Sequence, residues 1–207
     1  MTRRQQQLQP EAWRRILSYQ HASGNQLDRY VLCCTGPDLR EQAVPEGAEL
    51  ITVRAGSPAA DIAESLTINE QGFDPSAAAA TAAQAEAFRS NLAGGAAVTV
   101  RLDGAGTSGG MYTPVRDGVT ELVGIATLAP YRRRGLAGLV VATLAGLAFS
   151  SGADLLFLTT GDDHARGAYR RAGFADVDGP QPAADRLCPP GSAAAQAGAS
   201  CCPDPAG

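Results

Sequence analysis

The apolar and polar positions of the chain repeat with two periods, one typical of helices and one typical of strands. Segments with helical spacing alternate with short apolar runs that end in turn residues. The helices are expected at 10–19, 58–73, 75–93, 131–151 and 162–172, and the strands at 30–34, 49–53, 98–102, 110–115, 119–128, 155–159 and 174–177. This order, with a three-strand antiparallel meander in the middle, predicts an α+β (mixed α/β) fold with a partly antiparallel sheet.

Residues with capping preferences mark where two of the helices are expected to begin. Ser57 before Pro58 predicts a helix start, with a capping hydroxyl ahead of a proline at the first helical position. Asp74 before Pro75 repeats this signal. We therefore expect two consecutive helices, the second of them rich in alanine.

The chain divides by composition into three parts. Residues 1–48 form an extension with one helix and one short strand, and residues 49–177 carry regular helix and strand signals. From residue 178 onward Pro, Ala, Gly and Ser leave hardly any large apolar side chains, so we expect the tail at 178–207 to pack poorly. The length of 207 residues and a hydrophobic content of 44% fit one domain with its own core, expected at 49–177.

The charge and the cysteine content exclude several classes of protein. A net charge of −4 argues against a nucleic-acid binder that works by overall positive charge. The five cysteines show no metal-ligand spacing and are too few for a disulfide framework. The uncharged run at 135–153 contains four glycines and is too short to cross a bilayer. We expect a cytoplasmic protein that binds no nucleic acid, membrane or metal.

One glycine-rich segment matches a dinucleotide-binding motif but lacks the helix that must follow such a motif. Residues 104–109 match the G-x-G-x-x-G pattern of dinucleotide-binding loops. That function requires the third glycine to open a helix whose N-terminus holds the pyrophosphate. Because residues 111–115 have the composition of a strand, we interpret the glycines as part of a hairpin.

Three adjacent arginines, Arg132, Arg133 and Arg134, stand directly before an expected helix. Cations are unfavourable there because the helix dipole is positive at its N-terminus. An anion bound between the arginines and the unpaired amides of the first turn explains the cluster, and the small residues Gly135 and Ala137 leave those amides accessible. No Gly-Lys-Ser/Thr follows, which excludes a P-loop. The segment is therefore interpreted as a phosphate-binding loop.

The segment 121–138, ELVGIATLAPYRRRGLAG, resembles the acetyl-CoA-binding motif of the GNAT superfamily of N-acetyltransferases. Arg132, Gly135 and Ala137 satisfy the pattern Arg/Gln-x-x-Gly-x-Gly/Ala. The resemblance implies a GNAT-like fold, in which a mostly antiparallel twisted sheet is flanked by helices and two strands splay apart at the acetyl-CoA site. It also implies that the splayed strand pairs with the pantetheine arm through Ile125, Ala126 and Thr127, and that the pyrophosphate is held by Arg132, Arg133, Arg134, Gly135, Leu136, Ala137 and Gly138.

A second block, 158–174, is similar to the later motif of that family, Asn-x-x-Ala-x-x-x-Tyr-x-x-x-Gly-Phe. Ala165, Tyr169, Gly173 and Phe174 match it, whereas Asp162 stands where Asn is usual. By this resemblance Tyr169 is the acid that protonates the departing coenzyme A thiolate, a role that suits a phenol with a pKa of about 10. The resemblance covers about residues 49–177.

Glu121 is the candidate general base. It lies 14 residues before Gly135, the offset that the catalytic Glu occupies in the histone-acetylating branch of the family. An amine is mostly protonated at neutral pH, so a base is useful for acyl transfer. On a regular strand Glu121 shares a face with Val119, Val123 and Ile125. A strand carboxylate that faces solvent or pairs with an arginine remains the alternative.

The resemblance implies an N-acetyltransferase that acts on a primary amine of a small molecule or protein. A non-catalytic acyl-CoA-binding module and an unrelated nucleotide-phosphate binder remain as alternatives, and the oligomeric state, monomer or homodimer, stays open. GNAT domains usually end with two strands, but only 174–177 is convincing after the last helix. Either the N-terminal strand candidates, at 30–34 and 49–53, compensate or the sheet is short.

Overall fold

The structure, a computed structural model, describes residues 3–24 and 27–177, so the tail expected at 178–207 lies outside the described residues. Seven strands form one sheet in the order β2-β3-β4-β5-β6-β1-β7, antiparallel throughout except for the parallel pair β5 and β6. They are β1 (Tyr30–Cys34), β2 (Ala48–Val53), β3 (Ala96–Leu102), β4 (Ala105–Tyr112), β5 (Val119–Thr127), β6 (Leu155–Thr160) and β7 (Ala175–Asp176). The predicted α+β fold with a mostly antiparallel sheet is confirmed.

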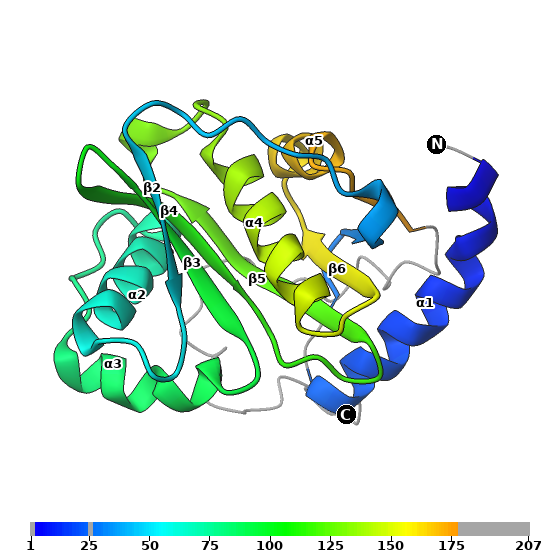
Figure 1. The fold of residues 1–207 in the computed structure, drawn as a ribbon, viewed down its shortest axis with the longest axis horizontal. Helices are drawn as coiled ribbons and strands as arrows, with labels where there is room; N and C mark the ends of the chain where they lie inside the picture. The colour runs from blue at the N-terminus through cyan, green and yellow to red at the C-terminus, as the bar shows by residue number, and fades with distance from the viewer. Residues whose placement is uncertain (1–2, 25–26, 178–207) are drawn as a thin grey trace, which may run out of the picture.

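Helices cover both faces of this sheet. They are α1 (Arg3–Ser23), α2 (Ala59–Phe73), α3 (Ala82–Phe88), α4 (Leu136–Ser150) and α5 (Asp163–Arg171), with short 3-10 turns η1 (Gly36–Asp38), η2 (Arg89–Leu92) and η3 (Ala129–Tyr131). In β3, Val98 and Val100 belong to the core beneath α4, whereas Ala97 belongs to the core beneath α2 and α3. Because alternate strand residues point to opposite faces, α4 and the α2–α3 pair lie on opposite faces. Figure 1 shows α1 at the other end of the molecule from α2 and α3.

The N-terminal segment is built into the sheet rather than attached to it. β1 lies between β6 and β7 and pairs with β6 from Tyr30↔Thr160 to Cys34↔Leu156. Leu32 is fully buried in the core beneath α4, and Val31 packs beneath α1 on the opposite face. Of the two alternatives that the sequence left open, the structure shows the first: the strand at 30–34 supplies the additional strand.

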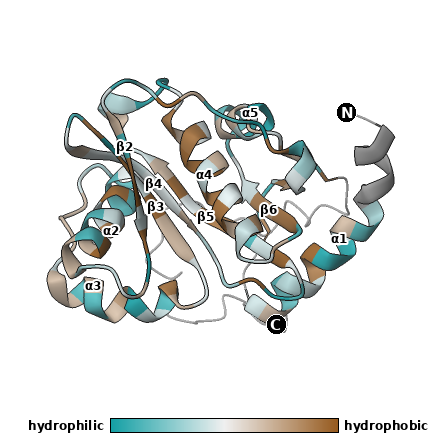
Figure 2. Cartoon of the chain, in the orientation of Figure 1, coloured by the Kyte–Doolittle hydropathy of each residue, from teal (hydrophilic) through white to brown (hydrophobic). Residues whose placement is uncertain are grey.

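Helix α4 is the apolar segment at 135–153. Eight of its fifteen residues are buried, among them Leu139, Val140, Val141 and Leu144. Figure 2 shows its hydrophobic turns lying over the sheet. Within residues 3–24 and 27–177 no helix combines the length and the hydrophobicity needed to span a membrane.

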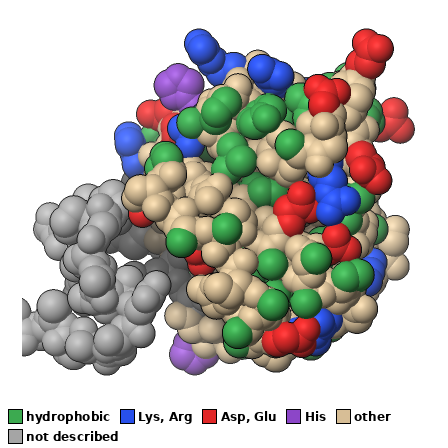
Figure 3. All heavy atoms as spheres, turned by 90° about the vertical axis from the view of Figure 1, so that its left-hand side faces the viewer, with side chains coloured by type: hydrophobic (Ala, Val, Ile, Leu, Met, Phe, Trp, Pro, Cys, Tyr) green, Lys and Arg blue, Asp and Glu red, His purple; other side chains and the backbone are tan. Residues whose placement is uncertain are grey.

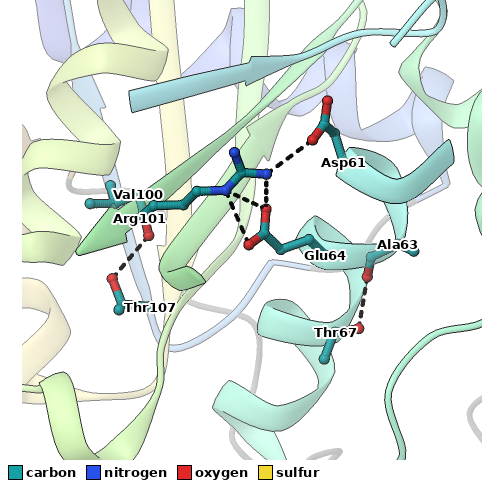
Figure 4. Close-up of polar contacts among 7 residues, drawn as sticks. All are labelled: Asp61, Ala63, Glu64, Thr67, Val100, Arg101 and Thr107. Carbon is teal, nitrogen blue, oxygen red and sulfur yellow. Dashed lines mark hydrogen bonds and ion pairs between the residues drawn. The ribbon is translucent and has the colours of Figure 1, made fainter. Parts of the chain in front are cut away.

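An ion cluster joins α2 to β3 (Figure 4). The Arg101 guanidinium donates to the Glu64 carboxylate at 2.7 Å and to the Asp61 carboxylate at 3.0 Å. These contacts hold α2 against the sheet, and the C-terminal end of α2 borders the cleft described below. On the side of the molecule that carries α2 and α3, acidic and basic side chains are interspersed (Figure 3).

The helix predicted from residue 75 begins later than expected. The Asp74 Oδ1 accepts hydrogen bonds from the N–H and the hydroxyl of Ser76, so Asp74 ends α2 in a turn instead of starting a helix. α3 begins at Ala82, where Thr81 and Gln84 form a capping box. The Asp-Pro pair misled the prediction because an Asp side chain caps a helix and closes a turn equally well.

Helix α2 begins within one residue of the predicted start, but the predicted Ser57 cap is wrong. Pro58 occupies the N-cap, and the Ser57 hydroxyl accepts a hydrogen bond from the Arg54 N–H instead of capping the helix. The glycine-rich segment 104–109 lies in the hairpin of β3 and β4, as we interpreted it. Asp103 and Gly104 form its turn with φ angles of 52° and 81°, and the following residues pair as a strand and open no helix.

Candidate active site

Strands β5 and β6 are parallel neighbours that separate along their length. They pair only at Val119↔Leu155, Thr120↔Leu156 and Glu121↔Phe157. Beyond Glu121 the two strands line opposite walls of a cleft of about 880 Å³. The cleft continues past the end of β5 along η3 and the first turn of α4.

A bulge in β5 sets the direction of the side chains along this wall. Gly124 has a φ of 62°, and the register against β4 shifts by one residue between Ala126 and Val123. The Asn69 side chain of α2 donates to the Gly124 carbonyl at 2.7 Å. The expectation that Ile125 shares a face with Glu121 is wrong, because the bulge turns Ile125 to the side of α4, where it packs on the α4 core.

The peptide groups of β5 alternate between β4 and the cleft. The Leu128 N–H bonds to β4, and the Glu121 carbonyl accepts from the Thr113 N–H beyond the end of β4. With the observed register, Val123 and Ala126 also face β4, whereas the peptide groups of Leu122 and Thr127 point to the other side. There the Leu122 N–H completes the last pairing with Phe157 of β6, and the Thr127 N–H faces the cleft.

The phosphate-binding loop predicted from the arginines has the backbone of an anion site. Gly135 is the N-cap of α4 with a φ of 81°, and Arg133 also has a left-handed φ of 64°. The Leu139 N–H is the first to bond within the helix, to the Gly135 carbonyl. Within the described residues no group accepts from the amides of Leu136, Ala137 and Gly138. Successive amides that point outward at a left-handed turn favour an anion.

The three arginines of this loop have different surroundings. The Arg132 guanidinium donates to the Thr127 carbonyl at 3.0 Å and to the Gly72 carbonyl at 2.8 Å, so it joins the ends of β5 and α2. Arg133 is exposed and lines the cleft. The Arg134 guanidinium stacks over the Tyr131 ring at 5.4 Å and is not among the residues that line the cleft.

Tyr169 reaches the cleft from α5. It is 6% exposed and belongs to the core beneath α4, and within the described residues its hydroxyl has no hydrogen-bond partner. Burial raises the pKa of Tyr169 to about 12, and the Asp162 carboxylate adds to this increase. Asp162 itself accepts a hydrogen bond from the His164 N–H as the N-cap of α5, which explains why an aspartate serves at this position.

Glu121 lies where the two strands separate and is 4% exposed. It is aligned with Phe157 and two residues beyond Val119, and both of these belong to the core beneath α1. Its carboxylate therefore points to the α1 side of the sheet, whereas Tyr169 approaches from the α4 side. Two groups capable of proton transfer thus border one cleft from opposite faces.

The cleft brings together all the predicted site residues except Arg134. Those that line it are Glu121, Ile125, Ala126, Thr127, Arg132, Arg133, Gly135, Leu136, Ala137, Gly138 and Tyr169. Other lining residues occupy no matched motif position and were missed, among them Asp28, Gln42, Gly72, Phe73, Leu158, Thr159, Thr160, Gly161, His164, Ala168 and Arg171. The 70% exposure of the Phe73 side chain at the cleft shows that a large hydrophobic residue faces solvent there.

In the described part of the chain we find neither a reactive cysteine thiolate nor a group of side chains that could bind a metal ion. Burial raises the pKa of the Cys33 and Cys34 thiols to about 12, so neither is a thiolate at neutral pH. No three His, Cys, Asp or Glu side chains of residues 3–24 and 27–177 gather in a way that could hold a metal ion.

Comparison with known proteins assigns the chain to a family. The profile of the acetyltransferase (GNAT) family matches residues 63–174. Among solved structures, a GCN5-related N-acetyltransferase from Kribbella flavida is 31% identical over 72% of this chain and 54% of its own, with a TM-score of 0.58. The chain thus spans about half the length of that protein. No curated protein sequence matches the chain.

Two more distant structures share the fold. A GCN5-related N-acetyltransferase from Sphaerobacter thermophilus is 17% identical over 78% of this chain and 52% of its own, with a TM-score of 0.54. An aminoglycoside acetyltransferase from an uncultured soil metagenomic sample, in complex with sisomicin, is 11% identical over 61% of this chain and 87% of its own, with a TM-score of 0.52.

Proposed function

Because the chain belongs to the acetyltransferase (GNAT) family, we propose that it transfers an acetyl group from acetyl-CoA to a primary amine of a small molecule or protein. One observation carries this proposal. The cleft between β5 and β6 has a helix start with open amides at one end, and Glu121 and Tyr169 border it from opposite faces of the sheet.

The residues present fit coenzyme A. The outward amides of Leu136, Ala137 and Gly138 and the exposed Arg133 suit a pyrophosphate. The peptide groups of β5 that face the cleft suit the amides of a pantetheine arm alongside Ile125, Ala126 and Thr127. The bound molecule supplies the acetyl group as an activated thioester.

Arg132 has a different task in this proposal. Its guanidinium is already bonded to the Thr127 and Gly72 carbonyls, so we assign it to shaping the loop and not to contacting phosphate with its side chain. Arg133 and the backbone amides then carry the phosphate contacts. Arg134, stacked on Tyr131, contributes longer-range positive charge.

The acid and base positions suit the two proton transfers of the reaction. Glu121 accepts a proton from the attacking amine as the new C–N bond forms. Tyr169 gives its proton to the sulfur as the C–S bond breaks, and the two residues recover their starting states by proton exchange with solvent. With a pKa of about 12, the Tyr169 phenol is protonated at neutral pH and ready to act as the acid. A peptide N–H that faces the cleft, at Thr127, polarises the thioester carbonyl.

The acceptor amine is expected to enter on the side of Glu121. Asp28 also lines the cleft, and a carboxylate there favours a protonated amine over a neutral or acidic acceptor. Cys33 and Cys34 are free thiols, which agrees with a reducing compartment such as the cytoplasm.

Two measurements test the function. Calorimetry with coenzyme A and with ATP should show much tighter binding of coenzyme A, and equal binding would favour a general nucleotide-phosphate binder. Thiol release from acetyl-CoA is then measured over a panel of primary amines. Tight coenzyme A binding without turnover on any amine would favour a non-catalytic acyl-CoA-binding module.

A further inference from the structure

Helix α1 reaches the point where β5 and β6 separate through the side chain of Tyr19. This side chain is 5% exposed, and its ring packs edge-on against Phe157 with the ring centroids 5.6 Å apart. The Tyr19 hydroxyl lies 2.5 Å from Oγ1 of Thr113 and donates to the Pro114 carbonyl at 3.0 Å. A buried hydroxyl needs such partners, since an unpaired one costs free energy. The contact therefore fixes α1 against the residues that follow β4.

Thr113 links Tyr19 to Glu121 through hydrogen bonds. Its Oγ1 accepts from the Glu121 N–H at 3.1 Å and donates to the Glu121 carbonyl at 3.2 Å, and its own N–H donates to that carbonyl at 3.0 Å. A hydroxyl has one hydrogen and two lone pairs. Because the Tyr19 hydrogen goes to the Pro114 carbonyl, the Thr113 hydrogen is shared between the Tyr19 oxygen and the Glu121 carbonyl, and a Thr113 lone pair accepts from the Glu121 N–H.

Tyr19 and Glu121 also lie on the same face of the sheet. Tyr19 belongs to the core beneath α1 with Val119 and Phe157, the residues whose face Glu121 shares. Burial raises the pKa of Tyr19 above its ordinary value. The nearby Glu121 carboxylate adds to this increase, whereas Thr113 and Arg116 oppose it. The phenol is therefore neutral at physiological pH and keeps its hydrogen for the contact.

We propose that Tyr19 is a positioning residue for Glu121: it fixes, through Thr113, the peptide groups of Glu121 where the cleft begins. Its importance for turnover rests on the proposed function, in which Glu121 is the general base. Tyr19 lies outside residues 63–174, the part that matches the family profile. A residue of the N-terminal segment thus completes the site.

The variant Tyr19→Phe tests this role because it removes one hydroxyl and keeps the ring against Phe157. The matched control is Tyr112→Phe, since Tyr112 is 1% exposed and its hydroxyl lies 3.0 Å from the Ser151 hydroxyl, away from the cleft. We expect Tyr19→Phe to lower kcat about tenfold, the effect of misplacing a base by one lost contact, with the KM for acetyl-CoA within about twofold. Tyr112→Phe should leave both constants unchanged.

Amide hydrogen exchange at Glu121, measured on the full chain, gives a readout that needs no turnover. Tyr19→Phe and Thr113→Val should each speed this exchange about tenfold, and the double variant should add little to Thr113→Val because the two residues act through one contact. Unchanged exchange, or faster exchange with an unchanged kcat, overturns the proposal. If the wild-type chain acetylates no amine, the proposed function fails, while the exchange data still decide whether Tyr19 holds Glu121.

Discussion

Two regions border the same cleft: the strand, loop and helix at 121–138, and the N-terminal segment at 3–34. They differ in how far apart in the sequence the residues lie whose contacts form them. In the first region the left-handed Gly135 and the open amides of α4 arise between sequence neighbours. In the second, Tyr19 meets Thr113 across 94 residues, and Tyr30 pairs with Thr160. The site is thus a local motif held in place by a distant segment.

The two regions also differ in burial, which separates their roles. Arg133, Arg134 and Gly135 are exposed, so changes there should affect binding more than stability. Leu32 and Ile16 of the N-terminal segment are fully buried, so changes there should affect stability first. Each of the following variants acts on one side of this division.

The largest effect is expected at Glu121, where the two regions meet. Glu121→Gln keeps the shape and the backbone contacts but removes the base, so kcat should fall by about 100- to 10,000-fold while coenzyme A affinity stays within about twofold. Thiol-release kinetics and calorimetry measure the two quantities. The control is Glu49→Gln, an exposed glutamate on β2 outside the cleft. An unchanged kcat in Glu121→Gln would place the base elsewhere.

The local region was predictable because its physics depends on neighbouring residues. Arg132, Gly135 and Ala137 predicted a helix start with accessible amides, and the structure shows the left-handed turn and the open amides at that place. Within the same region the face of Ile125 was mispredicted, since strand alternation assumes that no residue is inserted, and the Gly124 bulge inserts one.

The distant region was only partly predictable. Periodicity identified a helix and a strand before residue 35, but no pattern within a strand states which partner it will pair with. Phe73 and Gln42 carried no signal, because their place at the cleft depends on where α2 ends and on the loop that follows β1. The start of α3 was missed because Asp74 closes a turn with the same side chain that could cap a helix.

Leu32→Ala tests whether the N-terminal segment stabilises the fold. Leu32 is fully buried in β1, so the free energy of unfolding should fall by about 2–5 kcal/mol, as for other buried leucines. Leu17→Ala is the matched control in α1, where 42% exposure leaves little burial to lose. Urea unfolding measures both variants, and coenzyme A affinity of the folded Leu32→Ala chain should equal that of the wild type. Equal losses in the two variants would mean that β1 contributes no more to the core than a surface position.

Gly135→Ala tests whether the loop before α4 serves cofactor binding. An alanine forced to the left-handed φ of 81° is strained by about 1–2 kcal/mol, so the loop should rearrange and coenzyme A binding should weaken roughly tenfold. Gly146→Ala is the control in the same helix, because its added methyl meets open space and should stabilise the helix by about 0.5–1 kcal/mol. If calorimetry finds equal coenzyme A affinity in both variants, the left-handed turn does not contribute to cofactor binding.

At neutral pH the smallest effect comes from a pH dependence of stability that should arise mostly in the N-terminal segment and appear only above about pH 8. Burial raises the pKa of Cys33 and Cys34 to about 12, well above the ordinary value of 9.0, and that of Tyr169 to about 12 from 10.0. The unfolded chain therefore releases these protons first. The stability that they contribute is complete below about pH 9 and is lost toward pH 12, by up to about 1.4 kcal/mol per pH unit for each group. The double variant Cys33→Ala/Cys34→Ala should flatten most of the fall in unfolding free energy between pH 9 and 10, because the thiols of the unfolded chain ionise about one pH unit below its Tyr169 phenol. Urea unfolding at pH 8, 9 and 10 checks this, and a wild-type slope in the double variant would show that the thiols of β1 ionise as freely in the folded chain as in the unfolded one.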